Sequence, residues 1–97
     1  MPVPYFMVSY EYTDEPEAQA VVRPRHREFL RELGSTLALS GPTDANGAFL
    51  IFDAASADEV AALLDDDPFK HEGFIRARRV IGWTPVLGRW HESGLIS

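Results

Sequence analysis

Hydrophobic positions recur at helical spacing between residues 22 and 33, which predicts a central amphipathic helix. The inward stripe of this helix consists of Val22, His26, Phe29, Leu30 and Leu33. Pro24 suits a first helical position, and Gly34 suits the residue just past the end. His26 then lies on the apolar stripe near the helix start, and the neighbouring arginines are expected to point elsewhere. Because a buried polar group without a partner is costly, His26 is expected to have one.

Four other stretches have the alternation and composition of β-strands. Residues 5–12 and 48–53 carry apolar side chains on both faces, which is expected of central strands. Residues 36–40 have bulky side chains on one face only, as an edge strand does. Residues 41–47 form a turn cluster, and residues 74–86 predict the last strand.

A capping pattern predicts the second helix. Ser56 is followed three residues later by Glu59, which is the spacing of a capping box, and the helix is expected to run to about Asp65. Three consecutive acids suit a helix C-terminus badly, and Pro68 cannot continue the helix. Residues 87–97 are expected to form a tail, with 91–97 outside a domain core of about 3–90.

The predicted order, β-α-β-β-α-β, is that of the ferredoxin-like α+β fold. This fold is an antiparallel sheet with two helices on one face, and residues 1–97 are expected to form one such domain. The central strands are apolar on both faces, and the chain has no further element to cover the second face. A homodimer in which two sheets pack face to face is therefore expected.

Composition narrows the classes of function. The chain has 97 residues, no cysteine and a formal net charge of −6. This charge argues against nucleic-acid binding, which requires a surplus of Lys and Arg. The absence of cysteine excludes disulfides and thiolate chemistry, and no signal peptide or membrane-spanning stretch is evident. A cytoplasmic domain that does not associate with membranes is expected.

The topology brings three segments to one end of the sheet: the start of the first helix, the end of the 36–40 strand and the end of the second helix. His26, Ser40 and Asp67 are therefore candidate neighbours. A helix start favours a neutral imidazole, whereas a nearby carboxylate favours the charged form. The sequence leaves the balance between these two effects open.

Four short motifs resemble the YCII-related (YciI-like) proteins. They are Arg23-Pro24-x-His26, Ser40-Gly41-Pro42, Asp67-Pro68-Phe69 and Gly73, in this order. The resemblance implies a dimeric α/β barrel with a His–Asp pair in a pocket, carried here by His26 and Asp67. One branch of the family includes dehydrochlorinases of chlorinated hydroxyquinols, which suggests acid/base chemistry on small aromatic or carbonyl compounds. The arginine-rich last strand (Arg76, Arg78, Arg79) and the tail are not part of these motifs.

The candidate catalytic residues are thus His26 and Asp67, although an Asp before a proline also often caps a turn through its own side chain. The candidate substrate-binding residues are Arg23, Ser40, Gly41, Pro42 and Phe69. Two of these residues also have a purely structural interpretation. Arg23 could be an exposed residue at the helix start, and Ser40 could be a small residue at a strand end. No cofactor is expected.

Two groups outside this set have their own alternatives. His71 and His91 lack metal-ligand spacing with His26, so no metal site is expected. Arg76 and Arg78 share a face of the last strand and either line an acidic-ligand cavity or form a charged edge that discourages aggregation; the second interpretation is preferred.

Two functions remain from different classes. The first is a cofactor-independent enzyme, similar to a lyase, isomerase or hydrolase, in which Asp67 orients His26 and His26 moves a proton. The second is a non-catalytic dimer that binds a small molecule as a regulatory or accessory module. The feature that distinguishes them is whether the second ring nitrogen of His26 opens into a cavity.

Overall fold

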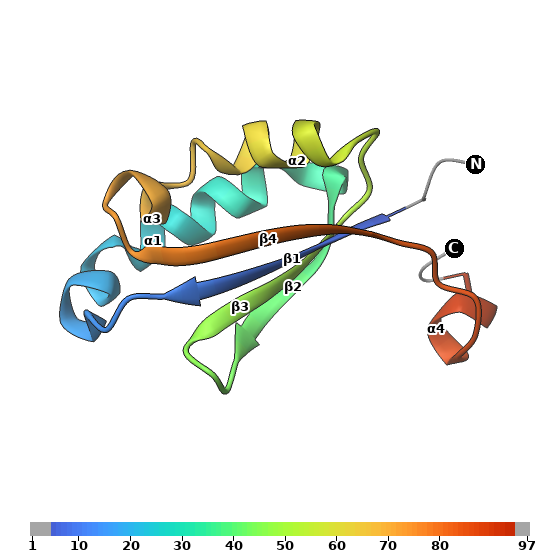
Figure 1. The fold of residues 1–97 in the computed structure, drawn as a ribbon, viewed down its shortest axis with the longest axis horizontal. Helices are drawn as coiled ribbons and strands as arrows, with labels where there is room; N and C mark the ends of the chain where they lie inside the picture. Colours follow the sequence, from blue (N-terminus) through green and yellow to red (C-terminus); the bar gives the residue numbers. More distant parts are fainter. Residues whose placement is uncertain (1–4, 95–97) are drawn as a thin grey trace.

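The structure is a computed structural model that describes residues 5–94. Its elements are β1 (Tyr5–Tyr12), α1 (Pro16–Glu32), a 3-10 turn (Gly34–Thr36), β2 (Leu37–Thr43), β3 (Gly47–Phe52), α2 (Ala57–Leu64), α3 (Pro68–His71), β4 (Ile75–Trp83) and α4 (Arg89–Glu92). The strands form one antiparallel sheet in the order β2-β3-β1-β4, and α1, α2 and α3 lie on one face of it (Figure 1). This is the predicted ferredoxin-like α+β fold.

The main core lies between the sheet and these helices. Its buried side chains are Phe6, Val8, Tyr10, Tyr12, Val22, Leu50, Phe52, Val60, Leu64, Phe69 and Phe74. The even-numbered residues of β1 point to this side, because successive side chains of a strand alternate between its faces. The predicted inward stripe of α1 is confirmed, since Phe29, Leu30 and Leu33 pack on this core and His26 is buried.

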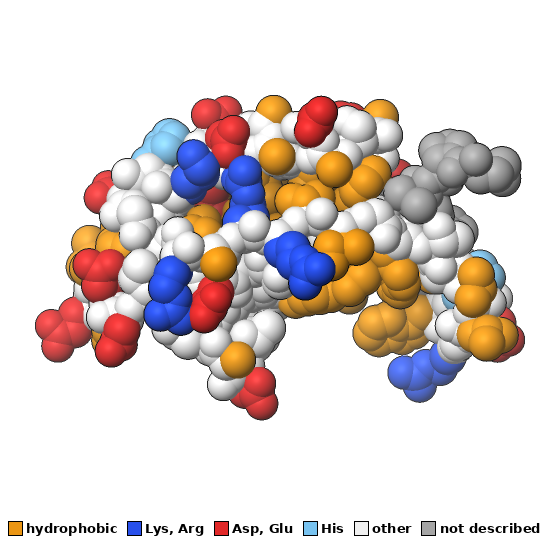
Figure 2. Space-filling view, viewed as in Figure 1, with side chains coloured by type: hydrophobic (Ala, Val, Ile, Leu, Met, Phe, Trp, Pro, Cys, Tyr) orange, Lys and Arg blue, Asp and Glu red, His pale blue; other side chains and the backbone are white. Residues whose placement is uncertain are grey.

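The opposite side of the sheet, called the outer face here, is also largely apolar. It consists of Tyr5, Met7, Leu39, Phe49, Ile51, Ile81 and Trp83, as the strand register shows. Figure 2 shows hydrophobic side chains gathered along this side toward the C-terminal segment. Tyr5 and Ile51 are buried with Trp83 packed on them, whereas Leu39 and Ile81 are nearly half exposed. The prediction that the central strands are apolar on both faces is therefore confirmed.

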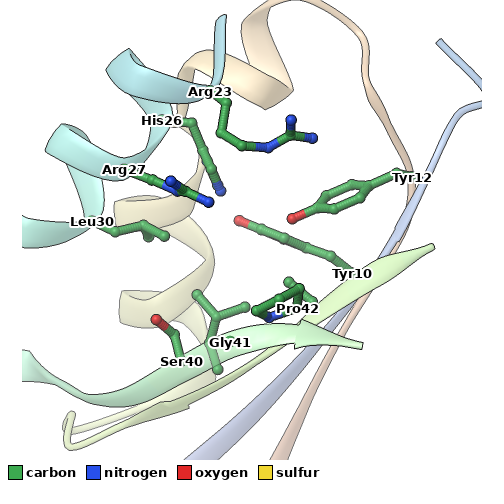
Figure 3. A pocket seen from close by; sticks show the side chains of 11 residues that line it. Tyr10, Tyr12, Arg23, His26, Arg27, Leu30, Ser40, Gly41 and Pro42 are labelled. Carbon is green, nitrogen blue, oxygen red and sulfur yellow. The ribbon is translucent and has the colours of Figure 1, made fainter. Parts of the chain in front are cut away.

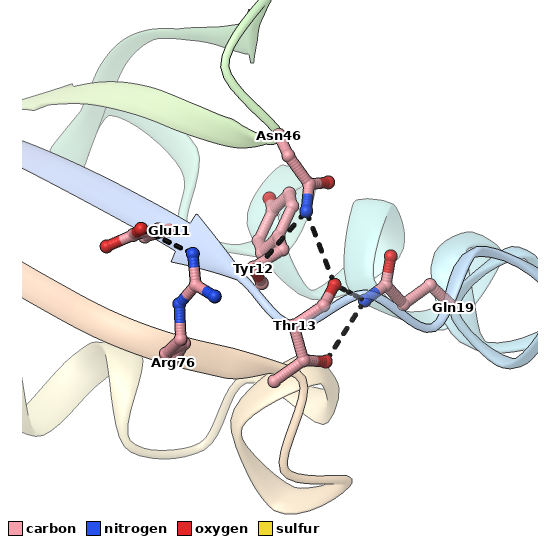
Figure 4. Close-up of polar contacts among 6 residues, drawn as sticks. All are labelled: Glu11, Tyr12, Thr13, Gln19, Asn46 and Arg76. Atoms are coloured by element: carbon pink, nitrogen blue, oxygen red, sulfur yellow. Dashed lines mark hydrogen bonds and ion pairs between the residues drawn. The ribbon is translucent and has the colours of Figure 1, made fainter.

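The first helix begins earlier than predicted. α1 begins at Pro16, which occupies the first helical turn, so Pro24 lies inside the helix rather than at its start. The turn before α1 is closed by Gln19, whose amide donates to the carbonyl and the hydroxyl oxygen of Thr13 (Figure 4). These bonds stabilise a helix start that lies two turns before Pro24. Because proline has no backbone N–H, α1 lacks one hydrogen bond at Pro24, and the helix tolerates this loss. Gly34 follows the helix with φ +64°, as predicted.

The second strand is longer than predicted. β2 continues through Thr43, so Gly41 and Pro42 belong to the strand and the turn is confined to residues 44–46. Pro42 is tolerated because β2 is an edge strand, where an N–H facing solvent is not needed. The turn is held by Asn46, whose side-chain amide donates to the carbonyls of Tyr12 and Thr13 (Figure 4).

The second helix begins and ends where the capping pattern predicts. The Ser56 hydroxyl accepts the backbone N–H of Glu59 at 3.1 Å, and the Glu59 carboxylate accepts the N–H of Ala55 at 3.0 Å. Two short helices were not predicted: α3 after Asp67, and α4 within the segment expected to be a tail. β4 ends at Trp83, before the expected 86, because the chain turns away at the following Thr-Pro. The last residues of the expected tail, 95–97, lie outside the described residues.

Candidate functional site

A buried histidine and a buried carboxylate form the centre of the site. The Nδ1 atom of His26 lies 2.7 Å from Oδ1 of Asp67, and their side chains are 8% and 0% exposed. His26 lies well inside α1 and not near its start, so the expected influence of the helix start on this ring does not apply. The imidazole stacks on Phe69, with ring centroids 4.1 Å apart and planes 16° apart. The ring is thus fixed by one hydrogen bond and one stacking contact.

Asp67 both caps a helix and holds the histidine. Its Oδ1 accepts the backbone N–H of Phe69 at 2.9 Å, which starts α3, and its Oδ2 accepts the Tyr10 hydroxyl at 3.3 Å. The capping role and the pairing role were alternatives in the sequence, and the structure combines them in one side chain. Because an ionised carboxylate only accepts hydrogen bonds, Nδ1 of His26 is the donor of this contact, and Nε2 is the ring nitrogen that does not face Asp67.

The His26 ring borders a cavity of about 410 Å³ between α1 and the three strands β1, β2 and β3. Its lining consists of Tyr10, Tyr12, Arg23, His26, Arg27, Leu30, Ser40, Gly41, Pro42, Ala48 and Leu50. Figure 3 shows the far end of the His26 ring pointing into this space, toward the hydroxyl ends of Tyr10 and Tyr12. A space of this size is in the usual range for small-molecule sites, which are mostly apolar with a few polar groups.

The structure brings most of the predicted site residues together. Arg23, Ser40, Gly41 and Pro42 all line the cavity beside His26. The register places Ser40 opposite Leu50 and Pro42 opposite Ala48, on the helix-facing side of β2, whereas Gly41 is opposite Phe49 of the outer face. Asp67 and Phe69 do not line the cavity.

Phe69 and Asp67 instead lie behind the imidazole. Phe69 is fully buried beneath the ring, and the guanidinium carbon of Arg23 lies 5.7 Å from the centre of the Phe69 ring. Asp67 is likewise fully buried. These two side chains therefore position the residues that face the cavity.

The sequence did not single out Arg27 or assign Tyr10 and Tyr12 to the site. Arg27 follows Arg23 by one helical turn and lines the cavity with it, so the expectation that the arginines near His26 all point elsewhere is wrong. The available signal was the spacing of four residues, which puts two helical side chains on the same side. For the tyrosines, the signal was their position on the same face of β1 as the core residues.

The tyrosine hydroxyls remain protonated in this environment. Burial, together with the charge of Asp67, raises the pKa of Tyr12 to about 12, and the same two causes raise the pKa of Tyr10 further. Tyr10 uses its hydroxyl hydrogen on Asp67, whereas the Tyr12 hydroxyl has no hydrogen-bond partner within residues 5–94. Tyr12 is therefore a neutral donor available to a ligand.

Two of the three arginines of β4 have partners outside the cavity. Arg76 pairs with Glu11 (Figure 4), and Arg78 donates to Asp65 at the end of α2 at 3.0 Å. A register shift between Glu11 and Tyr12 separates the two arginines, so the prediction that they act on one shared face is wrong. Both lie on β4, which is an edge strand of the sheet. Their role in discouraging aggregation stays a prediction.

The described part of the chain contains neither a metal-binding cluster nor a membrane-spanning helix. Within residues 5–94, no group of three or more His, Cys, Asp or Glu side chains is arranged to hold a metal ion. In the same range, no helix is both long and apolar enough to span a membrane.

The fold and the site together define an α+β domain of the ferredoxin-like class with a buried His–Asp pair whose histidine borders a cavity. A model of the YCII-related domain matches residues 3–84, and the chain belongs to this family. No curated protein matches the chain.

Three solved structures illustrate what the chain resembles. The 5-chloro-2-hydroxyhydroquinone dehydrochlorinase of Burkholderia phenoliruptrix, in complex with 2,5-dihydroxybenzoquinone, has a TM-score of 0.74 and 26% identity, covering 82% of this chain and 93% of its own. A protein from Agrobacterium tumefaciens has a TM-score of 0.55 and 17% identity over 84% of this chain and 92% of its own. An uncharacterised NIPSNAP domain protein from Burkholderia xenovorans has a TM-score of 0.53 and 14% identity over 84% and 93%. The last two show the fold alone.

Proposed function

We propose that this protein is a small-molecule enzyme that moves a proton on a hydroxylated ring compound, with His26 as the base. One observation carries the proposal. The His26 imidazole makes a buried 2.7 Å contact with Asp67 on one side, and the other end of the same ring faces the cavity. A base must reach its substrate while a second group holds its tautomer, and this arrangement meets both requirements. The family and the likeness to a dehydrochlorinase support the reaction class.

The chemistry follows from the side chains present. Nε2 of His26 takes the proton of a ring hydroxyl, and the ionised Asp67 stabilises the imidazolium that forms. Arg23 and the Tyr12 hydroxyl face the same cavity and stabilise the oxyanion left on the substrate.

Deprotonation of a ring hydroxyl by His26 can also lead to loss of chloride. This requires a keto tautomer of the substrate in which the chlorine is bonded to a saturated ring carbon. The oxygen electron pair then forms C=O, the ring double bond shifts, and chloride leaves with its bonding pair. The proton on His26 and the chloride account together for one HCl, so no oxidant or reductant is needed.

The direct test is chloride release from 5-chloro-2-hydroxyhydroquinone, measured by ion chromatography. His26→Asn is expected to lower kcat/KM by about 10²–10⁴-fold, the usual contribution of a general base. The fold is expected to persist, because the Asn amide donates to Asp67 as Nδ1 does. His71→Asn is the matched control, since His71 is exposed at the end of α3.

Asp67→Asn separates the positioning role from the base. It is expected to lower kcat by about 10–100-fold, less than His26→Asn, because it weakens orientation and charge but leaves the base in place. Full activity of His26→Asn contradicts the proposal. So does the absence of turnover by the unaltered protein on a panel of hydroxyquinols and small carboxylic acids. Binding of such a compound beside His26 without turnover establishes the non-catalytic binding module instead.

We also propose that the protein is a homodimer in which two outer faces pack together. An apolar face that includes the nearly half-exposed Leu39 and Ile81 is costly to leave in water, and stable interfaces bury about 800 Å² per partner. Sedimentation at micromolar concentration is expected to give a dimer, and Ile81→Glu a monomer. Val21→Glu, on the exposed side of α1, is the control that leaves the dimer intact. A folded monomer at that concentration contradicts the proposal.

A further inference from the structure

We propose that the cavity beside His26 selects a flat ring compound ionised at two opposite oxygens, and that Arg27 together with Arg23 recognises the two negative charges. This rests on the proposed function, because it assigns the substrate class of the same site. It makes Arg27 a specificity-determining residue at the cavity mouth.

The first support is the pairing of the four arginines of α1. Arg25 and Arg31 have carboxylate partners, Glu72 and Glu28. Arg23 and Arg27, the two that line the cavity, have no carboxylate partner within residues 5–94. Among the described residues, no Asp or Glu lines the cavity either, in a chain whose formal net charge is −6. Two arginines thus face one nearby carboxylate, that of Asp67, which is already bonded to His26 and Tyr10. The charge that remains at the cavity is positive and is left for a ligand.

The second support is the placement of the two guanidinium groups. Arg23 and Arg27 are one helical turn apart, and Figure 3 shows their guanidinium groups on either side of the His26 ring. A ring with an oxyanion at each end engages both, and it brings the ring between them to the imidazole.

The remaining lining suits such a ring. Leu30, Pro42 and Leu50 provide apolar walls, and a dry cavity of about 150 Å³ is already sufficient for benzene. The volume of about 410 Å³ leaves room for ring oxygens as well. The Tyr12 hydroxyl, which has no partner in residues 5–94, supplies a neutral hydrogen bond to one of them.

Arg23 and Arg27 are expected to contribute differently to the binding affinity. Arg23 is half-buried against Phe69, whereas Arg27 is exposed. An exposed charge is screened by solvent and by salt, so Arg27 is expected to contribute a modest, salt-sensitive share of the affinity. Its exposure also makes Arg27→Gln a safe variant, since no buried contact depends on it.

The test is equilibrium binding of three matched rings by calorimetry near neutral pH. The probes are 2,5-dihydroxy-1,4-benzoquinone, with two ionised oxygens, 2-hydroxy-1,4-benzoquinone, with one, and neutral 2,5-dimethoxy-1,4-benzoquinone. The chain has no cysteine for these quinones to alkylate. We expect the second charge to raise the affinity about ten-fold. In Arg27→Gln this gain is expected to fall about five-fold, while the affinity for the neutral ring stays unchanged.

Arg25→Gln is the matched control, because it removes the same charge from the same helix on a side that does not line the cavity. Equal affinities for the three probes, no binding of any of them, or an equal loss in Arg25→Gln and Arg27→Gln would each overturn the inference. The binding measurement does not require turnover. If the protein binds the probes according to their charge but releases no chloride, the proposed reaction is refuted and the inferred charge selectivity stands. Turnover that is indifferent to Arg27 and to probe charge refutes this inference alone.

Discussion

Two carboxylates near the end of α2 belong to different regions of the molecule. Asp65 is exposed and meets Arg78 of β4 at 3.0 Å and Lys70 at 3.6 Å. Asp67, only two residues later, is fully buried and meets His26 and Tyr10. The first belongs to the charged edge of the sheet, and the second lies behind the His26 ring that borders the cavity.

The difference shows that a carboxylate is made functional by what surrounds it. The charges around Asp65 are screened by water, and such contacts contribute little to stability. The bonds to Asp67 are made where water cannot replace them, so each lost partner leaves a buried group unsatisfied. A similar contrast separates two pairs of arginines: Arg76 and Arg78 of β4 have carboxylate partners, whereas Arg23 and Arg27 at the cavity have none within residues 5–94.

The largest effect is expected from removing each carboxylate in turn. Asp67→Ala deprives the His26 ring, the Tyr10 hydroxyl and a helix N–H of their acceptor, and it is expected to lower the free energy of unfolding by about 3 kcal/mol. Asp65→Ala is expected to leave the urea midpoint within error. Urea unfolding of both variants measures the comparison, and equal losses would show that burial of Asp67 is not what distinguishes the pair.

A second helix cap calibrates how much of the Asp67 effect is local. Ser56 caps α2 as Asp67 caps α3, but Ser56 has no partner beyond its own helix in the described residues. Ser56→Ala is therefore expected to cost about 1 kcal/mol in urea unfolding, the usual value of a cap. A loss as large as that of Asp67→Ala would mean that the cap alone explains the effect at Asp67.

The sequence predicts the pairing of His26 with Asp67 because two independent patterns converge on it. The helical stripe turns His26 inward, and the ferredoxin-like order brings the end of α2 to the same end of the sheet. The second argument placed His26 at that end of the sheet because it placed the helix start at Pro24, whereas α1 begins two turns earlier. The pair was predicted correctly, although His26 forms it from well inside the helix and not from its start.

The missed features depend on contacts between distant residues. Arg25 and Arg27 are alike in the sequence, and only the fold shows that Glu72 reaches the first and that the second borders the cavity. The separation of Arg76 from Arg78 arises from a register shift, which strand alternation alone does not predict. Local patterns thus predict faces and caps, while charge pairing across the sheet requires the structure.

At the cavity, ionisation of Tyr12 is expected to lower the stability of the fold in alkali. The pKa of Tyr12 is raised from 10.0 to about 12, mainly by burial, so its contribution to stability is complete below pH 10 and is lost as the pH rises through about 12. Solvent in the cavity screens the phenolate, which reduces the effect to about 1 kcal/mol or less. Urea unfolding between these pH values is expected to show a smaller decline in Tyr12→Phe than in the unaltered protein. Equal declines would mean that the Tyr12 hydroxyl titrates as it does in water.

The smallest effect is expected at the charged edge, in acid. The hydrogen bond from Arg78 is the main cause that lowers the pKa of Asp65, so whatever this pair contributes to stability is present above the ordinary carboxyl pKa and is lost as the pH falls through the lowered one. Arg78→Gln removes that bond and is expected to raise the Asp65 midpoint toward its ordinary value, as followed by the ¹³C shift of the carboxyl group. Arg76→Gln is the matched control, because Arg76 bonds Glu11 instead. An Asp65 midpoint that moves equally in both variants would show that the general field of β4, rather than one partner, holds this carboxylate ionised.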